Sequence, residues 1–209
     1  MTNRILWGRL NSINVQKVLW LCEDLQLDFE RLDAGMQFGL TQTQAYLDMN
    51  PNGLVPTLKE GNFVLWESHS ILRYLAKSHD TSRTLYPQSL EDCALVDQWL
   101  DWNNTSAWPP MRILFWGWIR CSAPDRDVAD LDKNRLIVQK MLVILDHQLS
   151  QFPWVAGERF TIADIPLALL VHRWLHLPIE RESLVNLERW FNAVSQRPGF
   201  IRYGGAALT

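Results

Sequence analysis

The spacing of hydrophobic positions changes near residue 90 of this 209-residue chain. Before that point, short apolar runs typical of strands alternate with segments in which apolar residues recur with helical periodicity. The order of these segments predicts a βαβ unit followed by a ββα unit, which together form a small mixed sheet with helices on its faces. The expected strands cover 5–7, 29–33, 57–59 and 63–66, and the expected helices cover 15–25, 43–48 and 68–77.

After residue 90 only helical periodicity continues. Thr161 is followed three residues later by Asp164, which is the spacing of a capping pair at a helix start. The polar, proline-containing stretch 81–89 separates the two patterns and is typical of a linker. The expected helices of the second half cover 90–108, 128–149, 162–175 and 184–195. We therefore expect an α+β chain with a βαβαββα domain over 1–80, a linker over 81–89 and an all-helical domain over 90–209.

Composition and charge narrow the class of protein. The chain carries 20 Lys and Arg against 23 Asp and Glu, a net charge of -3, without a basic run that would follow a phosphate backbone. This pattern argues against nucleic acid as a partner. The widely spaced Cys22, Cys93 and Cys121 favour free thiols in a reducing compartment over a disulfide framework. The first nine residues lack a signal-peptide core, and no apolar stretch approaches the roughly 18 residues that span a membrane. We expect a soluble, cytoplasmic protein without a membrane partner.

Residues 53–58 and the pair Glu67 and Ser68 form the most informative motif. Pro56 follows the branched Val55 at the first residue of an expected strand, where a cis peptide bond can hold backbone groups outward. Val55 would then pair with a ligand as an added strand does, and Ser68 at a helix start would hold a carboxylate. An ordinary trans proline is the alternative for Pro56 taken alone. Together the two segments predict a site for a small peptide ligand.

With these motifs, the chain resembles the cytosolic glutathione transferase family over essentially its whole length. The resemblance implies a thioredoxin-like first domain, an all-α second domain, glutathione as co-substrate and a homodimer. It also implies that Val55 and Pro56 hold the cysteinyl part of glutathione and that Glu67 and Ser68 bind its γ-glutamyl end. His69 stands where the family commonly has Asn or Thr. The resemblance rests on 50–58, on Glu67 and Ser68 followed by 71–75, and on Gly157 leading into 161–164.

The loop between the first strand and the first helix is where serine classes of this family place their catalytic hydroxyl. Alignment of the following residues puts Ser12 at that position, and Asn14 is the second candidate, because bacterial members use an asparagine whose amide can donate to sulfur. A simple N-cap is the alternative role for Ser12. In the same family the Thr161 and Asp164 pair is a folding element, so we expect Asp164 to be structural.

Three functions remain open at this stage. The first is a transferase that activates the glutathione thiol as thiolate and conjugates it to a small apolar electrophile in detoxification. The second is a disulfide reductase or peroxidase in which glutathione supplies every reacting thiol. The chain itself is not expected to supply one, because no cysteine lies in the catalytic loop and Cys22 is expected to pack in the core as a small hydrophobic residue. The third is a binding module without chemistry. Only His172 and His176 are paired at helical spacing, and no matching ligand completes a metal site, so no metal is expected.

Tryptophan is unusually frequent, with eleven residues, and crowds the segment 99–118. Core packing is the favoured account of Trp99 and Trp102, three residues apart on one helical face. Pro109 and Pro110 are expected to interrupt the helix in this tryptophan-rich segment. The broken segment is either a kinked core helix or an aromatic wall for the electrophile. Phe38 and Arg112 are further candidates for contact with glutathione. The candidate electrophile pocket comprises Trp108, Met111, Phe115 and Trp116.

Overall fold

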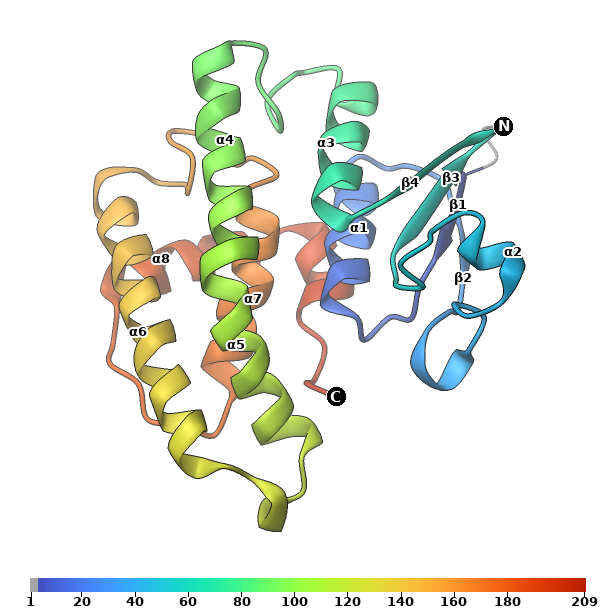
Figure 1. The fold of residues 1–209 in the computed structure, drawn as a ribbon. Helices are drawn as coiled ribbons and strands as arrows, with labels where there is room; N and C mark the ends of the chain where they lie inside the picture. Colours follow the sequence, from blue (N-terminus) through green and yellow to red (C-terminus); the bar gives the residue numbers. More distant parts are fainter. Residues whose placement is uncertain (1–3) are drawn as a thin grey trace. The chain divides into compact units, whose positions relative to one another are not determined.

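The computed structural model describes residues 4–209, so residues 1–3 of the expected first domain lie outside the described part (Figure 1). The chain forms two compact units. The first contains residues up to Arg83 together with Pro198–Ala206, and the second contains Thr84–Arg197 together with Ala207–Thr209. In the described part, no helix is long and apolar enough to cross a membrane.

The first unit is built on a four-stranded sheet with the strand order β2-β1-β3-β4. β1 runs parallel to β2 and antiparallel to β3, and β3 and β4 form an antiparallel hairpin. Its tight turn is made by Gly61, whose φ of 59° is the left-handed conformation that a short hairpin turn requires. The expected mixed sheet is confirmed. The strands are β1 (Arg4–Trp7), β2 (Glu30–Leu32), β3 (Thr57–Glu60) and β4 (Phe63–Trp66).

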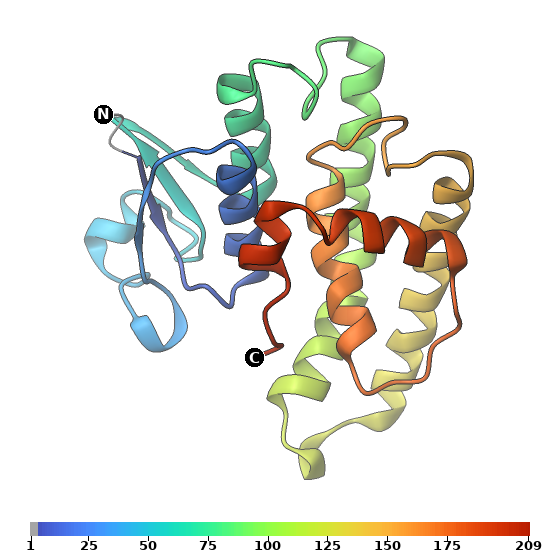
Figure 2. The same cartoon turned by 180° about the vertical axis from the view of Figure 1, so that it is seen from behind.

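Helices cover this sheet as the hydrophobic pattern predicts. The helices are α1 (Ile13–Asp24), α2 (Gln44–Leu47) and α3 (Ser68–His79). Figures 1 and 2 show α1 and α3 side by side on one face of the sheet, with α2 beyond its other face, and α1 and α3 contact each other along their lengths. The shared core is fully buried and includes Val18 and Leu19 of α1 and Ile71, Leu72 and Leu75 of α3.

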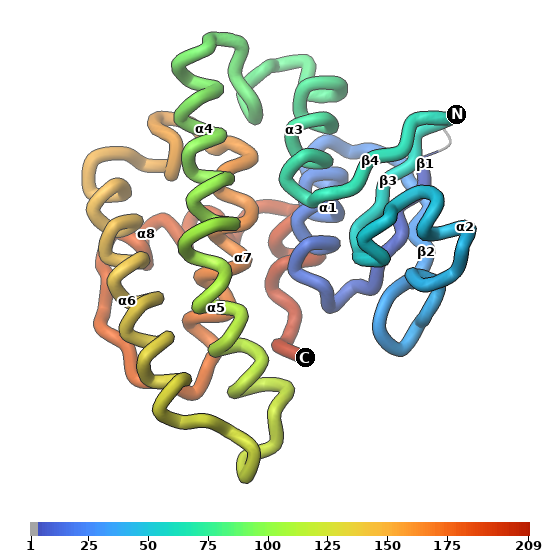
Figure 3. Tube along the Cα trace, viewed as in Figure 1, coloured from blue at the N-terminus to red at the C-terminus, as the bar shows by residue number. Residues whose placement is uncertain are grey.

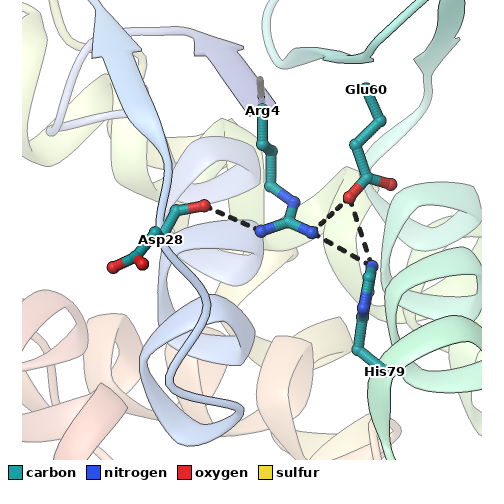
Figure 4. A network of polar contacts seen from close by, with 4 residues as sticks. All are labelled: Arg4, Asp28, Glu60 and His79. Carbon is teal, nitrogen blue, oxygen red and sulfur yellow. Dashed lines mark hydrogen bonds and ion pairs between the residues drawn. The ribbon is translucent and has the colours of Figure 1, made fainter. Parts of the chain in front are cut away.

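A buried polar network ties the end of α3 to the sheet (Figure 4). The Arg4 guanidinium forms an ion pair with Glu60, its partner across β1 and β3, and donates to the carbonyl of Asp28 at 2.7 Å. His79 Nε2 lies 3.2 Å from Glu60 Oε1. Burial would raise the pKa of Glu60, but hydrogen bonds from Tyr74 and Arg4, with the charges of Arg4 and His79, lower it below its usual range. The network therefore holds β1, β3 and α3 together through an ionised carboxylate.

The segment Pro198–Ala206 packs against α1, as the tube in Figure 3 shows, although the sequence prediction placed it in the helical domain. The N–H of Gly199 donates to Asp24 Oδ1 at 3.0 Å, and the rings of Phe200 and Trp20 meet edge to face at 5.3 Å. A Cβ on Gly199 would lie 2.1 Å from Trp20 Cδ1, so this close approach requires glycine. Tertiary packing that periodicity does not encode therefore assigns the segment to the first unit.

The second unit is helical, as predicted. Its helices are α4 (Leu90–Trp102), α5 (Trp108–Phe115), α6 (Val128–Gln151), α7 (Asp164–His176) and α8 (Val185–Val194). The expected interruption at Pro109 and Pro110 is wrong. Both prolines lie in the first turn of α5, directly after a π-helical turn at Asn103–Ala107, and a missing N–H is tolerated in a first turn. The helical path therefore continues from α4 through α5 and ends after a second π-helical turn, Trp116–Arg120.

Asp164 is fully buried at the start of α7. Its carboxylate accepts hydrogen bonds from the N–H groups of Val155 at 3.1 Å and Thr161 at 2.8 Å and from Trp190 Nε1 at 2.9 Å. Burial raises the pKa of Asp164 to about 6, although these hydrogen bonds oppose the shift. The Thr161 hydroxyl in turn accepts from the N–H of Ala163 at 3.3 Å, so the predicted capping pair is present. The contacts of Asp164 are those of a structural residue.

Candidate functional site

The first part of the candidate site is the start of α1. The turn after β1 is tight, because a Cβ on Gly8 would lie 2.3 Å from Val15 Cγ2. Ser12 follows in an extended conformation at the N-cap position and is 7% exposed, and its carbonyl accepts the N–H of Gln16 at 2.8 Å. Its side chain makes no capping hydrogen bond. The N-cap alternative therefore describes the backbone of Ser12 but not its hydroxyl, which lies at the positive end of α1.

The second part is the loop that precedes β3. The Val55–Pro56 peptide bond is cis, as the motif predicts. Asn50 is buried and donates from Nδ2 to the carbonyl of Leu54 at 2.9 Å and to Thr57 Oγ1 at 3.0 Å. Because β3 begins at Thr57, the peptide groups of Val55 lie before the ladder that pairs β3 with β1. Hydrogen bonds from the Asn50 side chain thus hold the loop in place, while Val55 itself lies outside the sheet pairing.

The third part is the start of α3. Glu67 precedes the helix with a φ of 71°, a left-handed conformation that few residues other than glycine adopt and that is common at binding sites. Its side chain is exposed, whereas Ser68, the first residue of α3, is buried. An exposed carboxylate and a hydroxyl at a helix N-terminus suit the amino and carboxylate groups of an amino acid.

Lys17 links the starts of the two helices and was missed by the sequence analysis. Its side chain is 2% exposed, and Nζ lies 3.0 Å from Asn14 Oδ1 and 3.1 Å from His69 Nε2. A lysine inside the largely apolar helical run 13–22, three residues after Asn14, was the signal that could have revealed it. The structure thus places Asn14 and His69, both named from the sequence, in one polar cluster around the buried side chain of Lys17.

Arg9 is the second residue that the sequence analysis did not assign. A Cβ on Gly35 would lie 3.2 Å from Arg9 Nη1 and 3.5 Å from Val55 Cγ1, so the guanidinium and the Val55 side chain both approach Gly35. This places a positive charge beside the cis-proline loop. Phe38 ends the short 3₁₀ segment Met36–Phe38 that follows, and it is 44% exposed. Its contact with glutathione stays a prediction.

The candidate electrophile residues lie in the helical unit and differ in burial. Met111 and Phe115 are buried, Trp108 is partly buried and Trp116 is 46% exposed. The Arg173 guanidinium lies 4.0 Å from the centre of the Phe115 ring. Core packing therefore accounts for Met111 and Phe115, whereas Trp116 keeps an open face. The role of the four residues toward a substrate stays a prediction, as does that of Arg112.

The expected core roles of two other side chains are confirmed. Cys22 is buried in α1, and burial raises the pKa of its thiol to about 12, so it stays protonated at neutral pH. Trp99 is buried and meets Trp102, which is only partly buried, edge to face at 5.2 Å. No group of three or more His, Cys, Asp and Glu side chains that could hold a metal occurs within residues 4–209.

Comparisons with known proteins agree with this geometry. The model of the glutathione S-transferase N-terminal domain matches residues 3–77, and that of the C-terminal domain matches 107–198. The chain is 35% identical to glutathione S-transferase GstB of Escherichia coli over 195 residues, which is 92% of this chain and 93% of that protein. It is 28% identical to glutathione S-transferase 1 of Manduca sexta over 86% of this chain and 82% of that protein.

Solved structures give the same result. The theta class glutathione S-transferase from Xanthomonas axonopodis pv. citri, with glutathione bound, is 39% identical, with full coverage of both chains and a TM-score of 0.95. Poplar glutathione transferase F1 is 26% identical, with 97% of each chain covered and a TM-score of 0.87. The chain therefore shares its predicted thioredoxin-like domain and all-helical domain with these proteins. The chain therefore belongs to the glutathione S-transferase family, which is a family of transferases.

Proposed function

We propose that this protein conjugates glutathione to small apolar electrophiles and that Ser12 activates the thiol. The observation that carries the proposal is the Ser12 hydroxyl, which lies at the N-terminus of α1 without a capping hydrogen bond. A hydroxyl placed there can donate to a sulfur atom bound in front of the helix. The helix end favours the same negative charge.

The groups at the start of α1 can supply the free energy that is needed to lower the pKa of the glutathione thiol. Glutathione reacts as thiolate, and a free cysteine thiol has a pKa of about 8.5. Lowering that pKa by about two units requires about 2.7 kcal/mol. A hydrogen bond to a charged group supplies about 1.5–3 kcal/mol, and a helix N-terminus adds about 0.3–1 kcal/mol. One hydroxyl at a helix start is therefore sufficient.

The remaining parts of the site suit the rest of glutathione. Val55, outside the sheet pairing, would bind the cysteinyl backbone as an added strand, next to Pro56. Glu67 would pair with the γ-glutamyl amino group, and Ser68 with the N-terminus of α3 would hold its carboxylate. The relative from Xanthomonas, which has glutathione bound and covers the whole chain, supports this ligand.

Steady-state conjugation of glutathione to an aryl halide such as 1-chloro-2,4-dinitrobenzene tests the proposal. Ser12→Ala should lower kcat by about 30- to 150-fold, the equivalent of a charged hydrogen bond of about 2–3 kcal/mol, and should leave the KM for glutathione within a few-fold. Ser89→Ala is the matched control, because Ser89 caps α4 in the helical unit. An unchanged kcat in Ser12→Ala would reject Ser12 as the activator.

The same assay separates Ser12 from Asn14. If Asn14→Ala loses activity while Ser12→Ala retains it, the amide activates the thiol. High turnover of a small mixed disulfide without conjugation would instead favour the glutathione-dependent reductase. The apolar electrophile and its pocket, the homodimer, the cytoplasmic location and the role in detoxification stay predictions that follow from the family resemblance and from composition.

A further inference from the structure

We propose that Lys17 is a positioning residue of the thiol site, which orients the amide of Asn14 as a second donor to the glutathione sulfur and adds a buried positive charge behind the site. The inference rests on the proposed function, because it assumes that a thiol binds at the start of α1. It starts from a lysine side chain that is almost completely withdrawn from water.

The position of the ammonium is unusual for a lysine. Lysine side chains are almost never fully buried, because removing the charge from water costs free energy that a structural role alone seldom offsets. Lys17 Nζ instead lies within hydrogen-bonding distance of the second residue of α1, Asn14, and of the second residue of α3, His69. The ammonium therefore lies at the two helix starts that carry Ser12 and Ser68.

The chemistry of the ammonium fixes the orientation of Asn14. An ammonium has three donors and no acceptor, so only the carbonyl oxygen of the Asn14 amide can face it. The contact of 3.0 Å is indeed made by Oδ1. The Nδ2 group is then directed away from Lys17, on a side chain that is partly exposed in the first turn of α1. With Lys17 present, Asn14 offers two N–H donors two residues after Ser12.

The same reasoning applies to the contact with His69. An ammonium can only donate, so Nε2 of His69 is the acceptor of the 3.1 Å contact with Lys17 Nζ. A histidine in the first turn of α3 can accept this bond, as the amide oxygen of an asparagine would. Lys17 thereby connects the start of α3, which carries Ser68, to the start of α1, which carries Ser12.

The charge acts in the same direction as the orientation. The N-terminus of a helix has a positive partial charge, so a cation placed there adds to the potential that favours a bound anion. Here an ammonium adds to two helix starts at once. The position of the Lys17 ammonium is explained if the site binds an anion. Bound glutathione would provide two anionic groups, a thiolate at the start of α1 and a carboxylate at the start of α3.

Ultraviolet difference titration of bound glutathione tests the inference, since it follows the thiolate directly. Lys17→Met keeps the length of the side chain, removes its charge and leaves the Asn14 amide free to turn. We expect it to raise the pKa of the bound thiol by about one unit or more, the size of the effect of a nearby charge. We expect the dissociation constant of glutathione to change less than about threefold, since most of its contacts are unaffected. Lys140→Met, an exposed lysine of α6, is the matched control and should leave both values unchanged.

A double-mutant cycle separates positioning from packing. If Lys17 acts partly through Asn14, the pKa shift in Lys17→Met with Asn14→Ala should be smaller than the sum of the two single shifts. Asn14→Asp gives a second variant that keeps an acceptor for Lys17 but has no N–H donor, and it should also raise the thiol pKa. It keeps the inference testable if Lys17→Met does not fold.

Two outcomes would overturn the inference in different ways. If wild type lowers the thiol pKa and Ser12→Ala abolishes that effect while Lys17→Met does not change it, the role of Lys17 is wrong and the proposed function stands. Weaker glutathione binding by Lys17→Met with an unchanged thiol pKa would likewise show a purely structural lysine. If wild type itself does not lower the thiol pKa, the proposed function fails, and the inference fails with it.

Discussion

The starts of α1 and α7 use the same elements of helix capping in opposite ways. At α7, the Asp164 carboxylate is fully buried and accepts from two backbone N–H groups and from Trp190. At α1, Ser12 holds the N-cap position, but its hydroxyl makes no capping hydrogen bond. The first arrangement satisfies polar groups within the protein. The second leaves a donor at the positive end of a helix, where an anionic ligand can use it.

This difference separates a structural helix start from a functional one. A buried acceptor surrounded by donors stabilises the fold, and removing it leaves those donors without partners. A donor that is not engaged by the fold contributes little to stability and can be directed at a substrate. The two starts should therefore respond in opposite ways to mutation, with stability affected at α7 and chemistry affected at α1.

Removal of the Asp164 carboxylate should give the largest loss of stability. Asp164→Ala would leave the N–H groups of Val155, Thr161 and Trp190 buried without their acceptor, and we expect the free energy of unfolding to fall by about 3–5 kcal/mol. Urea unfolding followed by circular dichroism measures it. Glu158→Ala, at an exposed position in the preceding loop, should change stability by less than about 0.5 kcal/mol. If Asp164→Ala lost no more free energy of unfolding than this control, Asp164 would not be a structural residue, and the contrast between the two helix starts would be wrong.

The pH dependence of stability sharpens the same contrast. The folded pKa of Asp164 is about 6, above its ordinary value of 3.8, so the unfolded chain releases this proton first as pH rises. The stability of wild type relative to Asp164→Asn should therefore be greatest below pH 4 and fall by up to about 3 kcal/mol as pH rises through 6. Urea unfolding of both proteins between about pH 4 and 7.5 tests this sign, and a difference that grows with pH would contradict it.

The smallest expected effect concerns two serines at N-cap positions. The Ser89 hydroxyl accepts from the N–H of Asp92 at 3.1 Å, so Ser89→Ala should lower the free energy of unfolding by about 1 kcal/mol. Ser12→Ala removes no capping bond, and we expect a change of less than about 0.5 kcal/mol. Urea unfolding at one pH compares them. Equal losses would mean that Ser12 acts as an ordinary cap in solution.

The sequence predicted most of what local rules determine. The cis bond before Pro56 was expected from this segment in combination with Glu67 and Ser68 and from the family resemblance, because an isolated proline favours the trans form, and the structure contains it. The strands of the sheet and the capping pair at Asp164 follow from turn chemistry, periodicity and residue spacing, and the structure contains both. These features depend on residues that are close together in the chain. Local patterns were therefore enough to predict them.

Features that depend on packing between distant segments were not predicted. Lys17 and His69 are 52 positions apart, and only the packing of α1 against α3 brings them together. The pairing of Gly199 with Asp24 likewise joins segments 175 positions apart. The effect of Pro109 was misjudged for another reason, because a helix that passes through a π-helical turn can begin a new first turn where proline is tolerated.

The central claim is that the Ser12 hydroxyl donates a hydrogen bond to the thiol of a bound ligand and does not act as a helix cap that stabilises the fold. Ultraviolet difference titration of glutathione bound to wild type and to Ser12→Ala tests it most directly. We predict a thiol pKa about two units below that of the free thiol in wild type, and most of this shift lost in a variant that still binds glutathione and unfolds at the same urea concentration. A bound thiol with the pKa of free glutathione in wild type, or the same lowered pKa in both proteins, would contradict the claim.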